Sequence, residues 1–206
     1  MMTEPEKTIS NFKAIFEVIS SKEFLNMEGL SGEVPFWIAP YDIQYQDIAS
    51  QEFVFLRNKL KSQGGKALNI NLFELSIELI DSNIGLEIIF EVEQKRTKEK
   101  FKRALQSTLN LQERLIPRII EMVDKEKPQL LIITGVGAVF PFIRSHNVLN
   151  NLQSAITEIP TLMFFPGEYN GRSLNLFGNL KDDNYYRAFN IFEYKVNLTT
   201  NKSDIL

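Results

Sequence analysis

The chain has 206 residues, of which 44% are apolar and 24% are charged, and its formal net charge is −3. This length and composition are typical of a globular protein, and they exclude a disordered or fibrous chain. Because the sequence contains no cysteine, disulfide bonds, thiolate metal ligands and cysteine nucleophiles are excluded as well. We therefore expect one domain over residues 1–206.

The sequence predicts neither export nor membrane insertion. Residues 1–7 are polar and acidic, whereas a secretory signal has a basic start and then an apolar run. The longest charge-free stretch, residues 128–143, is too short to span a membrane. We expect a cytoplasmic protein. Its negative net charge argues against direct DNA binding as the main activity, although a local basic face could coexist with it.

The first third of the chain alternates helical and strand patterns. Apolar residues at helical spacing predict an amphipathic helix within an N-terminal helical segment, residues 1–30. An apolar run over residues 34–39, closed by Pro40, predicts a strand. Helical spacing then covers residues 42–62, up to a glycine pair that can end a helix, and residues 68–72 alternate as a second strand would.

The rest of the chain completes the pattern of an α/β fold. Residues 74–126 predict two or three helices, one of which begins or kinks at Pro117. Residues 130–133 form an apolar run typical of a strand buried on both faces of a parallel sheet, and residues 161–165, closed by Pro166-Gly167, repeat it. We therefore predict a layered, mainly parallel sheet flanked by helices, with a helix-rich central segment.

Two glycine-rich turns invite comparison with nucleotide-binding loops. Gly135-Val136-Gly137 follows a predicted parallel strand, at the end where open α/β sheets bind ligands. Phe140, however, stands where the dinucleotide-binding pattern has its third glycine. A tight turn is the favoured interpretation, and a degenerate nucleotide-binding site around Gly135 is the alternative. Gly64-Gly65-Lys66 lacks the first glycine and the hydroxyl of a P-loop, so we interpret it as a helix cap.

Residues 91–95 contain the Glu-x-Lys element of many metal-dependent nucleases. If residues 86–92 formed a strand, two carboxylates and a lysine on its edge could hold Mg²⁺ and orient a water molecule. If they formed a helix, the apolar residues would share one face and the charges would be solvated. We favour the helix. The alternative is a cryptic nuclease that would use Asp81, Glu91, Glu93 and Lys95.

Two polar segments remain as functional candidates. The single histidine, His146, is predicted in the first turns of a helix, where a structural or interface role is favoured over metal binding because no Cys or second His is available. Residues 181–187 combine charged and aromatic side chains, and Asp182 or Asp183 is predicted to cap a final helix over residues 185–189. A metal or recognition site there is the alternative, and adjacent Tyr and Arg are also typical of interface hot spots.

We find no complete set of catalytic residues, so we assign no catalytic residue, metal ligand or cofactor. The two polar segments together form a candidate partner surface, which we call the polar surface. It comprises Arg144, His146, Asn147, Lys181, Asp182, Asp183, Tyr186 and Arg187.

Several distinctive segments lie in a motif-rich region over residues 130–190. They are GVGAVFPFIRSHN at 135–147, LNNLQ at 149–153, FFPGEY at 164–169 and LFGNLKDDNYYRAF at 176–189. Earlier in the chain, NLFEL lies at 71–75. Together these segments resemble the BrxB family of bacteriophage exclusion (BREX) systems, and the length of the segments in the motif-rich region makes the resemblance specific.

The resemblance implies a role in antiviral defence, since BREX systems methylate self DNA and block the replication of phage DNA. Its implied companions are PglZ, a member of the alkaline phosphatase superfamily, an adenine-specific DNA methyltransferase and a large AAA+ ATPase. The family has no established catalytic residues to carry over. We therefore expect a non-catalytic scaffold or adaptor that docks on PglZ, and the third alternative is a DNA-binding subunit.

Overall fold

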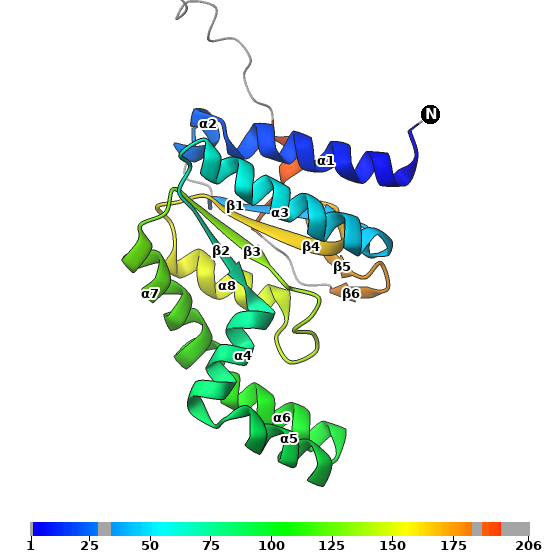
Figure 1. Ribbon diagram of the computed structural model, residues 1–206, viewed down its shortest axis with the longest axis vertical. Coiled ribbons are helices and arrows are strands. Elements are labelled where there is room, and N and C mark those ends of the chain that lie inside the picture. The colour runs from blue at the N-terminus through cyan, green and yellow to red at the C-terminus, as the bar shows by residue number, and fades with distance from the viewer. Residues whose placement is uncertain (1, 29–33, 183–186, 195–206) are drawn as a thin grey trace, which may run out of the picture.

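The computed structural model describes residues 2–28, 34–182 and 187–194. It confirms the α/β fold, with a mainly parallel sheet of strand order β2–β3–β4–β1–β7 between two layers of helices (Figure 1). The parallel strands are β1 (Phe36–Tyr41), β2 (Ala67–Asn71), β3 (Leu130–Thr134), β4 (Thr161–Tyr169) and β7 (Phe189–Asn190). The strands β5 (Leu174–Leu176) and β6 (Leu180–Asp182) add an antiparallel extension to β4.

The helices divide between the two faces of the sheet. One face is covered by α1 (Glu4–Ile19), α2 (Lys22–Leu25) and α3 (Gln46–Ser62). The other is covered by α4 (Leu72–Asn83), α7 (Ile116–Glu126) and α8 (Ser145–Ala155). From α4, the helices α5 (Leu86–Lys95) and α6 (Lys98–Leu109) extend to the end of the molecule that lies farthest from α1 (Figure 1). Among the described residues, no helix has the length and apolar composition that a membrane crossing requires.

Each central strand contributes to both cores, because successive side chains of a strand point to opposite faces. In β3, Leu131 and Ile133 pack in the core beneath α4, α7 and α8, whereas Leu130 and Ile132 pack beneath α1 and α3. The four side chains are fully or almost fully buried. The continuous apolar run of residues 130–133 therefore has the predicted explanation, a strand buried on both faces.

The predicted ends of two strands were wrong. Pro40 and Pro166-Gly167 were expected to close their strands, but β1 and β4 continue through them. Strands tolerate proline best where one edge is unpaired, and β1 is bordered by β7 only at Trp37 and Ile38. In β4, Gly167 with φ of 149° lies where the strand leaves the parallel sheet and pairs with β5.

The helix-rich centre is more divided than predicted. Residues 74–126 contain parts of four α-helices and a π-helical turn, Leu111–Leu115, rather than two or three helices. The divisions occur at Gly85 and Asn110, which have positive φ, and at Thr97, whose hydroxyl caps α6. Pro117 lies in the first turn of α7, as predicted.

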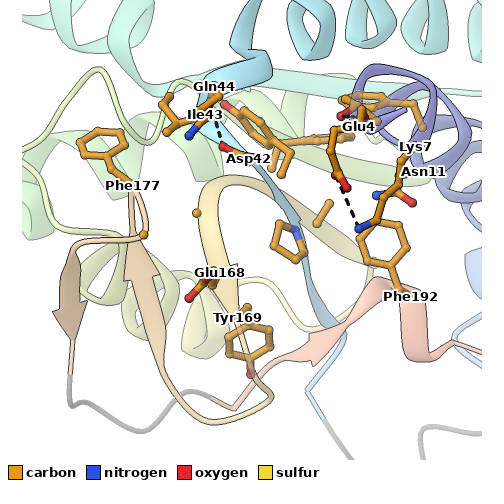
Figure 2. A pocket seen from close by; sticks show the side chains of 18 of the residues that line it. Glu4, Lys7, Asn11, Asp42, Ile43, Gln44, Glu168, Tyr169, Phe177 and Phe192 are labelled. Carbon is orange, nitrogen blue, oxygen red and sulfur yellow. Dashed lines mark hydrogen bonds and ion pairs between the residues drawn. The ribbon is translucent and has the colours of Figure 1, made fainter. Parts of the chain in front are cut away.

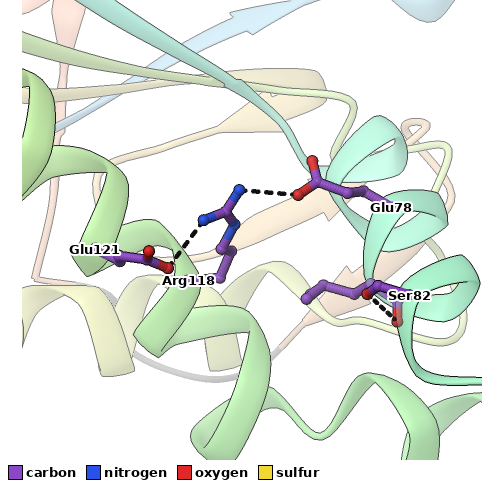
Figure 3. Close-up of polar contacts among 5 residues, drawn as sticks. Glu78, Ser82, Arg118 and Glu121 are labelled. Atoms are coloured by element: carbon purple, nitrogen blue, oxygen red, sulfur yellow. Dashed lines mark hydrogen bonds and ion pairs between the residues drawn. The ribbon is translucent and has the colours of Figure 1, made fainter.

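An ion-pair network ties α7 to α4 (Figure 3). The Arg118 guanidinium donates to Glu121 of its own helix and to Glu78 of α4, each at 2.9 Å. The hydrogen bonds to Glu121 and then to Glu78 raise the pKa of Arg118. We call residues 72–109, which form α4, α5 and α6, the arm; Arg118 links the base of this arm to the body of the protein.

Candidate functional site

The carboxyl ends of the parallel strands meet at one edge of the sheet and carry two neighbouring cavities. The chain leaves β1 toward α3 on one face, but it leaves β2 and β3 toward α4 and α8 on the other face. Connections that diverge in this way open a crevice, and open α/β sheets usually bind ligands there. This edge is therefore the expected place for functional side chains.

The first cavity has a volume of about 590 Å³ and lies between α1 and the ends of β1 and β4 (Figure 2). Three carboxylates and one ammonium group are among its lining groups, from Glu4, Lys7, Asp42 and Glu168. Lys7 pairs with Glu4 at 3.6 Å, and Asp42 accepts the backbone N–H of Gln44 at 2.9 Å. Glu168 accepts a hydrogen bond from the side-chain amide of Asn175 at 3.1 Å, so all three carboxylates have partners within the protein.

The second cavity, of about 450 Å³, has a wall of amide and hydroxyl groups. They come from Asn69 and Asn71 of β2, Thr134 of β3, and Tyr41, Gln46 and Ser50 around the start of α3. Arg57 and Glu74 are the charged residues in this wall. Thr134 Oγ1 donates to Asn69 Oδ1 at 3.4 Å, so the two strand ends are joined. Such a wall could hold a small polar ligand mainly through uncharged hydrogen bonds.

Tyr41, Phe12 and Phe164 line both cavities and form the partition between them. The rings of Phe12 and Phe164 are stacked, with centroids 5.3 Å apart. Tyr41 donates its hydroxyl hydrogen to Gln46 Oε1 at 2.7 Å. Burial raises the pKa of Tyr41 to about 12, against the smaller opposing effect of that hydrogen bond. Tyr41 therefore stays a neutral hydrogen-bond donor near pH 7.

The glycines at this edge are required by packing between chain segments. A Cβ atom on Gly135, where φ is 74°, would collide with the side-chain oxygen of Asn71, which caps α4. On Gly137, it would come within 2.9 Å of both Phe177 and Pro166. These contacts support the tight-turn interpretation of the Gly-Val-Gly motif and explain its glycines without a nucleotide.

Hydrogen bonds draw the motif segments together around β4. The buried Tyr169 hydroxyl donates to the carbonyl oxygen of Ala188 at 2.6 Å. Asn190 donates to the carbonyl oxygen of Tyr169 at 3.4 Å, and Gln153 of α8 donates to that of Arg187 at 2.7 Å. Several residues of the motif-rich region therefore serve to hold its own segments together.

The residues of the alternative nuclease site lie on or next to a helix. Residues 86–92 belong to α5, as favoured, so the strand edge that would present the Glu-x-Lys element is absent from this part of the described chain. Asp81 accepts the N–H of Leu86, and Glu91 pairs with Lys95 at 2.9 Å. Glu91 and Glu93 are two positions apart, about 200° around a helix. In the described residues, no three His, Asp or Glu side chains lie close enough to share a metal ion.

The first segment of the polar surface lies at the start of α8. Arg144 is the N-cap residue, and its carbonyl oxygen accepts the N–H of Asn147 at 3.1 Å. His146 lies in the first turn of the helix, as predicted. Its side chain is half-buried, whereas Asn147 is exposed. The side chain of Asn151 donates to the carbonyl oxygen of Asn147 at 2.7 Å. The first segment of the polar surface is therefore the N-terminal turn of α8.

The second segment of the polar surface does not contain the predicted helix in its described part. Lys181 and Asp182 belong to β6, and Phe189 begins β7, so the final helix over residues 185–189 was wrong at its end. A short strand offers too few residues for a periodic pattern to reveal it. Asp183 and Tyr186 lie outside the described residues, as does the side chain of Asp182.

The described members of the polar surface can be placed relative to α8. The bond from Gln153 places Arg187 beside α8, but roughly 10 Å along the helix from His146. Lys181 pairs with Asn175 of β5, and within the described residues it has no hydrogen bond to α8. Because Asp183, Tyr186 and the side chain of Asp182 lie outside the described residues, the joining of the two segments into one partner surface stays a prediction.

An apolar cavity of about 170 Å³ in the arm was not predicted from the sequence. It lies among α4, α5, α6 and the loop after β3, and Phe73 and Phe90 at its wall are 46% and 53% exposed. The two cavities at the sheet edge were not predicted either. Asn69, Asn71 and Thr134 could have indicated the second of these, because polar residues at the ends of neighbouring parallel strands meet at one edge.

Comparison with known proteins gives a consistent assignment. The family described as "BREX protein BrxB" matches residues 68–191. A BREX protein BrxB of Bacillus cereus (strain H3081.97) is 35% identical over 181 residues, which cover 87% of this chain and 94% of that protein. One of Escherichia coli O9:H4 (strain HS) is 30% identical over 173 residues, which cover 84% and 86%. No solved structure matches the chain. As the motif segments indicated, the chain belongs to the BrxB family, a component of BREX phage-defence systems.

Proposed function

We propose that this chain is a non-catalytic scaffold or adaptor that docks on the PglZ-type component of its BREX system and helps to assemble the complex. The observation that carries the proposal is the apolar cavity of the arm, with Phe73 and Phe90 exposed at its wall. Exposed aromatic side chains around an apolar hollow are typical of protein interfaces, where they act as anchors.

The walls of this cavity come from segments far apart in the sequence. Besides the two exposed rings, they include Ile80 of α4, Ile89 of α5, Leu105 of α6 and Phe142 from the loop after β3. Ile89 and Leu105 are buried and belong to the core beneath α4, α7 and α8. An interface formed here would therefore rest on packed side chains rather than on a loose loop, which lowers the cost of ordering it.

The cavity also adjoins part of the polar surface. Phe142 lines the cavity, and Arg144 follows two residues later as the exposed N-cap residue of α8. An apolar centre with a polar, charged rim is the usual anatomy of a protein interface. Arg144, His146 and Asn147 are thus candidates for the rim of the surface whose centre is Phe90.

Co-purification with tagged PglZ, the ATPase and the methyltransferase, each tested separately, is the experiment that tests this proposal. We expect stable pairing with PglZ and its loss in Phe90→Ser. Ile88→Ser is the matched control, since Ile88 lies on the same helix and is also 53% exposed but does not line the cavity. Thermal unfolding should confirm that both variants fold, because substitutions at exposed positions usually change stability by less than about 0.5 kcal/mol.

The outcomes separate the role from the surface. No pairing of the wild type with any of the three companions would contradict the adaptor role. If Arg187→Ala abolishes pairing and Phe90→Ser does not, the adaptor role stands and the docking surface is the polar one. If Phe90→Ser and Ile88→Ser weaken pairing equally, the cavity is not the anchor.

A second candidate, a degenerate site for a nucleotide or another small polar ligand, is favoured by the two cavities at the carboxyl edge of the sheet. Their volumes of about 590 and 450 Å³ lie within the usual range of ligand pockets. A thermal-shift screen with nucleotides tests it. We expect a stabilising shift that Asn69→Ala removes if the second cavity binds the ligand, and no shift for any nucleotide would exclude nucleotide binding there.

A further inference from the structure

The charges of this acidic protein are segregated. Residues 95–103 contain six of the 23 basic residues and one of the 26 acidic residues, so this segment carries +5. The remaining residues, with 17 basic and 25 acidic side chains, carry −8. We call residues 95–103 the basic tip. The net charge of −3 therefore conceals a strongly cationic segment.

The cations of the basic tip are exposed and largely unpaired. Lys95 pairs with Glu91 at 2.9 Å. Within the described part of the chain, no carboxylate lies at ion-pair distance from the other five cations, Arg96, Lys98, Lys100, Lys102 and Arg103. All of them except the half-buried Lys102 are exposed. Cations that the protein itself leaves unneutralised are available to an anionic partner.

The basic tip is also accessible to a large partner. It spans the end of α5, the connection capped by Thr97 and the first half of α6. These two helices lie at the end of the molecule farthest from α1 (Figure 1). Along α6, Lys98 and Arg103 are five positions apart, roughly 7.5 Å at the rise of an α-helix. The tip thus presents a compact group of positive charges on a projecting element.

The side chains of the tip favour phosphates over the other common anionic surfaces. Protein interfaces are depleted of lysine and enriched in aromatic residues, but four of the six cations are lysines and the one aromatic residue, Phe101, is half-buried against the core. Residues 95–103 expose no large apolar side chain that could enter a lipid bilayer or stack on unpaired bases. A nucleic-acid duplex needs neither, because its phosphates alone attract lysine and arginine.

We propose that the basic tip binds the phosphate backbone of a nucleic-acid duplex without reading its base sequence. Contacts to phosphates orient a protein on a duplex but carry no sequence information. The expected affinity is that of non-specific binding, with a dissociation constant on the order of 10⁻⁶ to 10⁻⁴ M at physiological salt. No residue of the tip lines the apolar cavity, although α5 and α6 contribute to both.

Fluorescence anisotropy of labelled mixed-sequence DNA and RNA duplexes, measured across a range of salt concentrations, tests this proposal. The tip variant carries Arg96→Gln, Lys98→Gln and Lys100→Gln. The matched control carries Lys13→Gln, Lys22→Gln and Lys125→Gln, which are exposed on α1, α2 and α7 and change the net charge equally. We expect the slope of log K against log salt to become shallower by about 3 in the tip variant and to stay unchanged in the control.

A conservative variant separates charge from folding. Arg96→Lys, Lys98→Arg and Lys100→Arg together should keep the affinity and slope of the wild type, because the charges are retained. The proposal is overturned if the wild type does not bind either duplex at low salt, or if the tip variant and the control lose affinity equally. It is also overturned if the tip variant keeps its duplex affinity but loses pairing with a BREX companion or with vesicles containing anionic lipid.

Discussion

The carboxyl edge of the sheet and the arm use their conspicuous side chains in opposite ways. At the edge, Gly137 packs against Phe177, and Tyr169 is bonded to Ala188. In the arm, Phe73 and Phe90 are half-exposed. The edge coincides with the longest motif segments, whereas the arm after Leu75 has an ordinary helical sequence. The comparison teaches that residues of a conspicuous motif can be required by internal packing, whereas exposed aromatic side chains can lie in another part of the molecule.

The largest effect on stability should come from truncating a buried leucine to alanine, and we compare one such leucine in the body of the protein with one in the arm. Leu131 of β3 is fully buried in the centre of the sheet, and Leu105 of α6 is 6% exposed. We expect Leu131→Ala to lower the free energy of unfolding by about 4 kcal/mol and Leu105→Ala by about 2 kcal/mol, because the arm can relax around the deleted atoms. Urea unfolding measures both; equal losses would mean that the arm is packed as rigidly as the body.

A smaller effect should follow from adding one methyl group to β4 where it begins to pair with β5. In Gly167→Ala, the new Cβ would collide with the backbone oxygen of Asn175, and φ is unfavourable as well, so we expect a loss of about 3 kcal/mol. Gly171→Ala is the control, since its φ is 82° but nothing lies within 4 Å. It should lose about 1 kcal/mol in the same thermal unfolding assay, and a similar loss for both would contradict a packing requirement at Gly167.

The smallest effect should appear where the arm meets the body. Arg118→Ala removes the ion pairs to Glu78 and Glu121, but the arginine side chain is 35% exposed and the partners are more so. Exposed pairs contribute little after solvent screening, so we expect a loss of about 0.5 kcal/mol in urea unfolding. The difference from wild type should shrink at high salt. A loss that salt does not change would indicate that the aliphatic part of Arg118 provides the contact.

Local patterns predicted those parts of the fold that depend on local causes. The helix α3 ends at Ser62 before the glycine pair, and β3 is buried on both faces, both as predicted. These features could be predicted because they depend on the spacing and polarity of neighbouring residues in the sequence. The ends of β1 and β4 were missed since they depend on which strands lie beside Pro40 and Gly167. The strands β5, β6 and β7 were missed because three residues or fewer show no periodicity.

For the candidate sites, the sequence predicted which secondary-structure element a residue belongs to, but not which residues from distant segments it contacts. It placed His146 correctly at the start of a helix. It gave no sign that the side chain of Asn71 occupies the space that a Cβ at position 135 would need. Likewise, it gave no sign that Gln153 of α8 donates to the carbonyl oxygen of Arg187. Contacts between distant segments decide such questions.

The pairing of β1 with β4 has a consequence for synthesis on the ribosome. Phe36 and Thr161 are partners in this pair although 125 positions separate them. During synthesis, α1, β1 and α3 leave the ribosome long before β4, the strand with which β1 pairs. The long-range pairing delays completion of the sheet, because the chain must lose the entropy of closing a large loop before the stabilising contacts between β1 and β4 can form. Until β4 emerges, the apolar strand β1 and the inner faces of α1 and α3 form a surface that a chaperone would recognise.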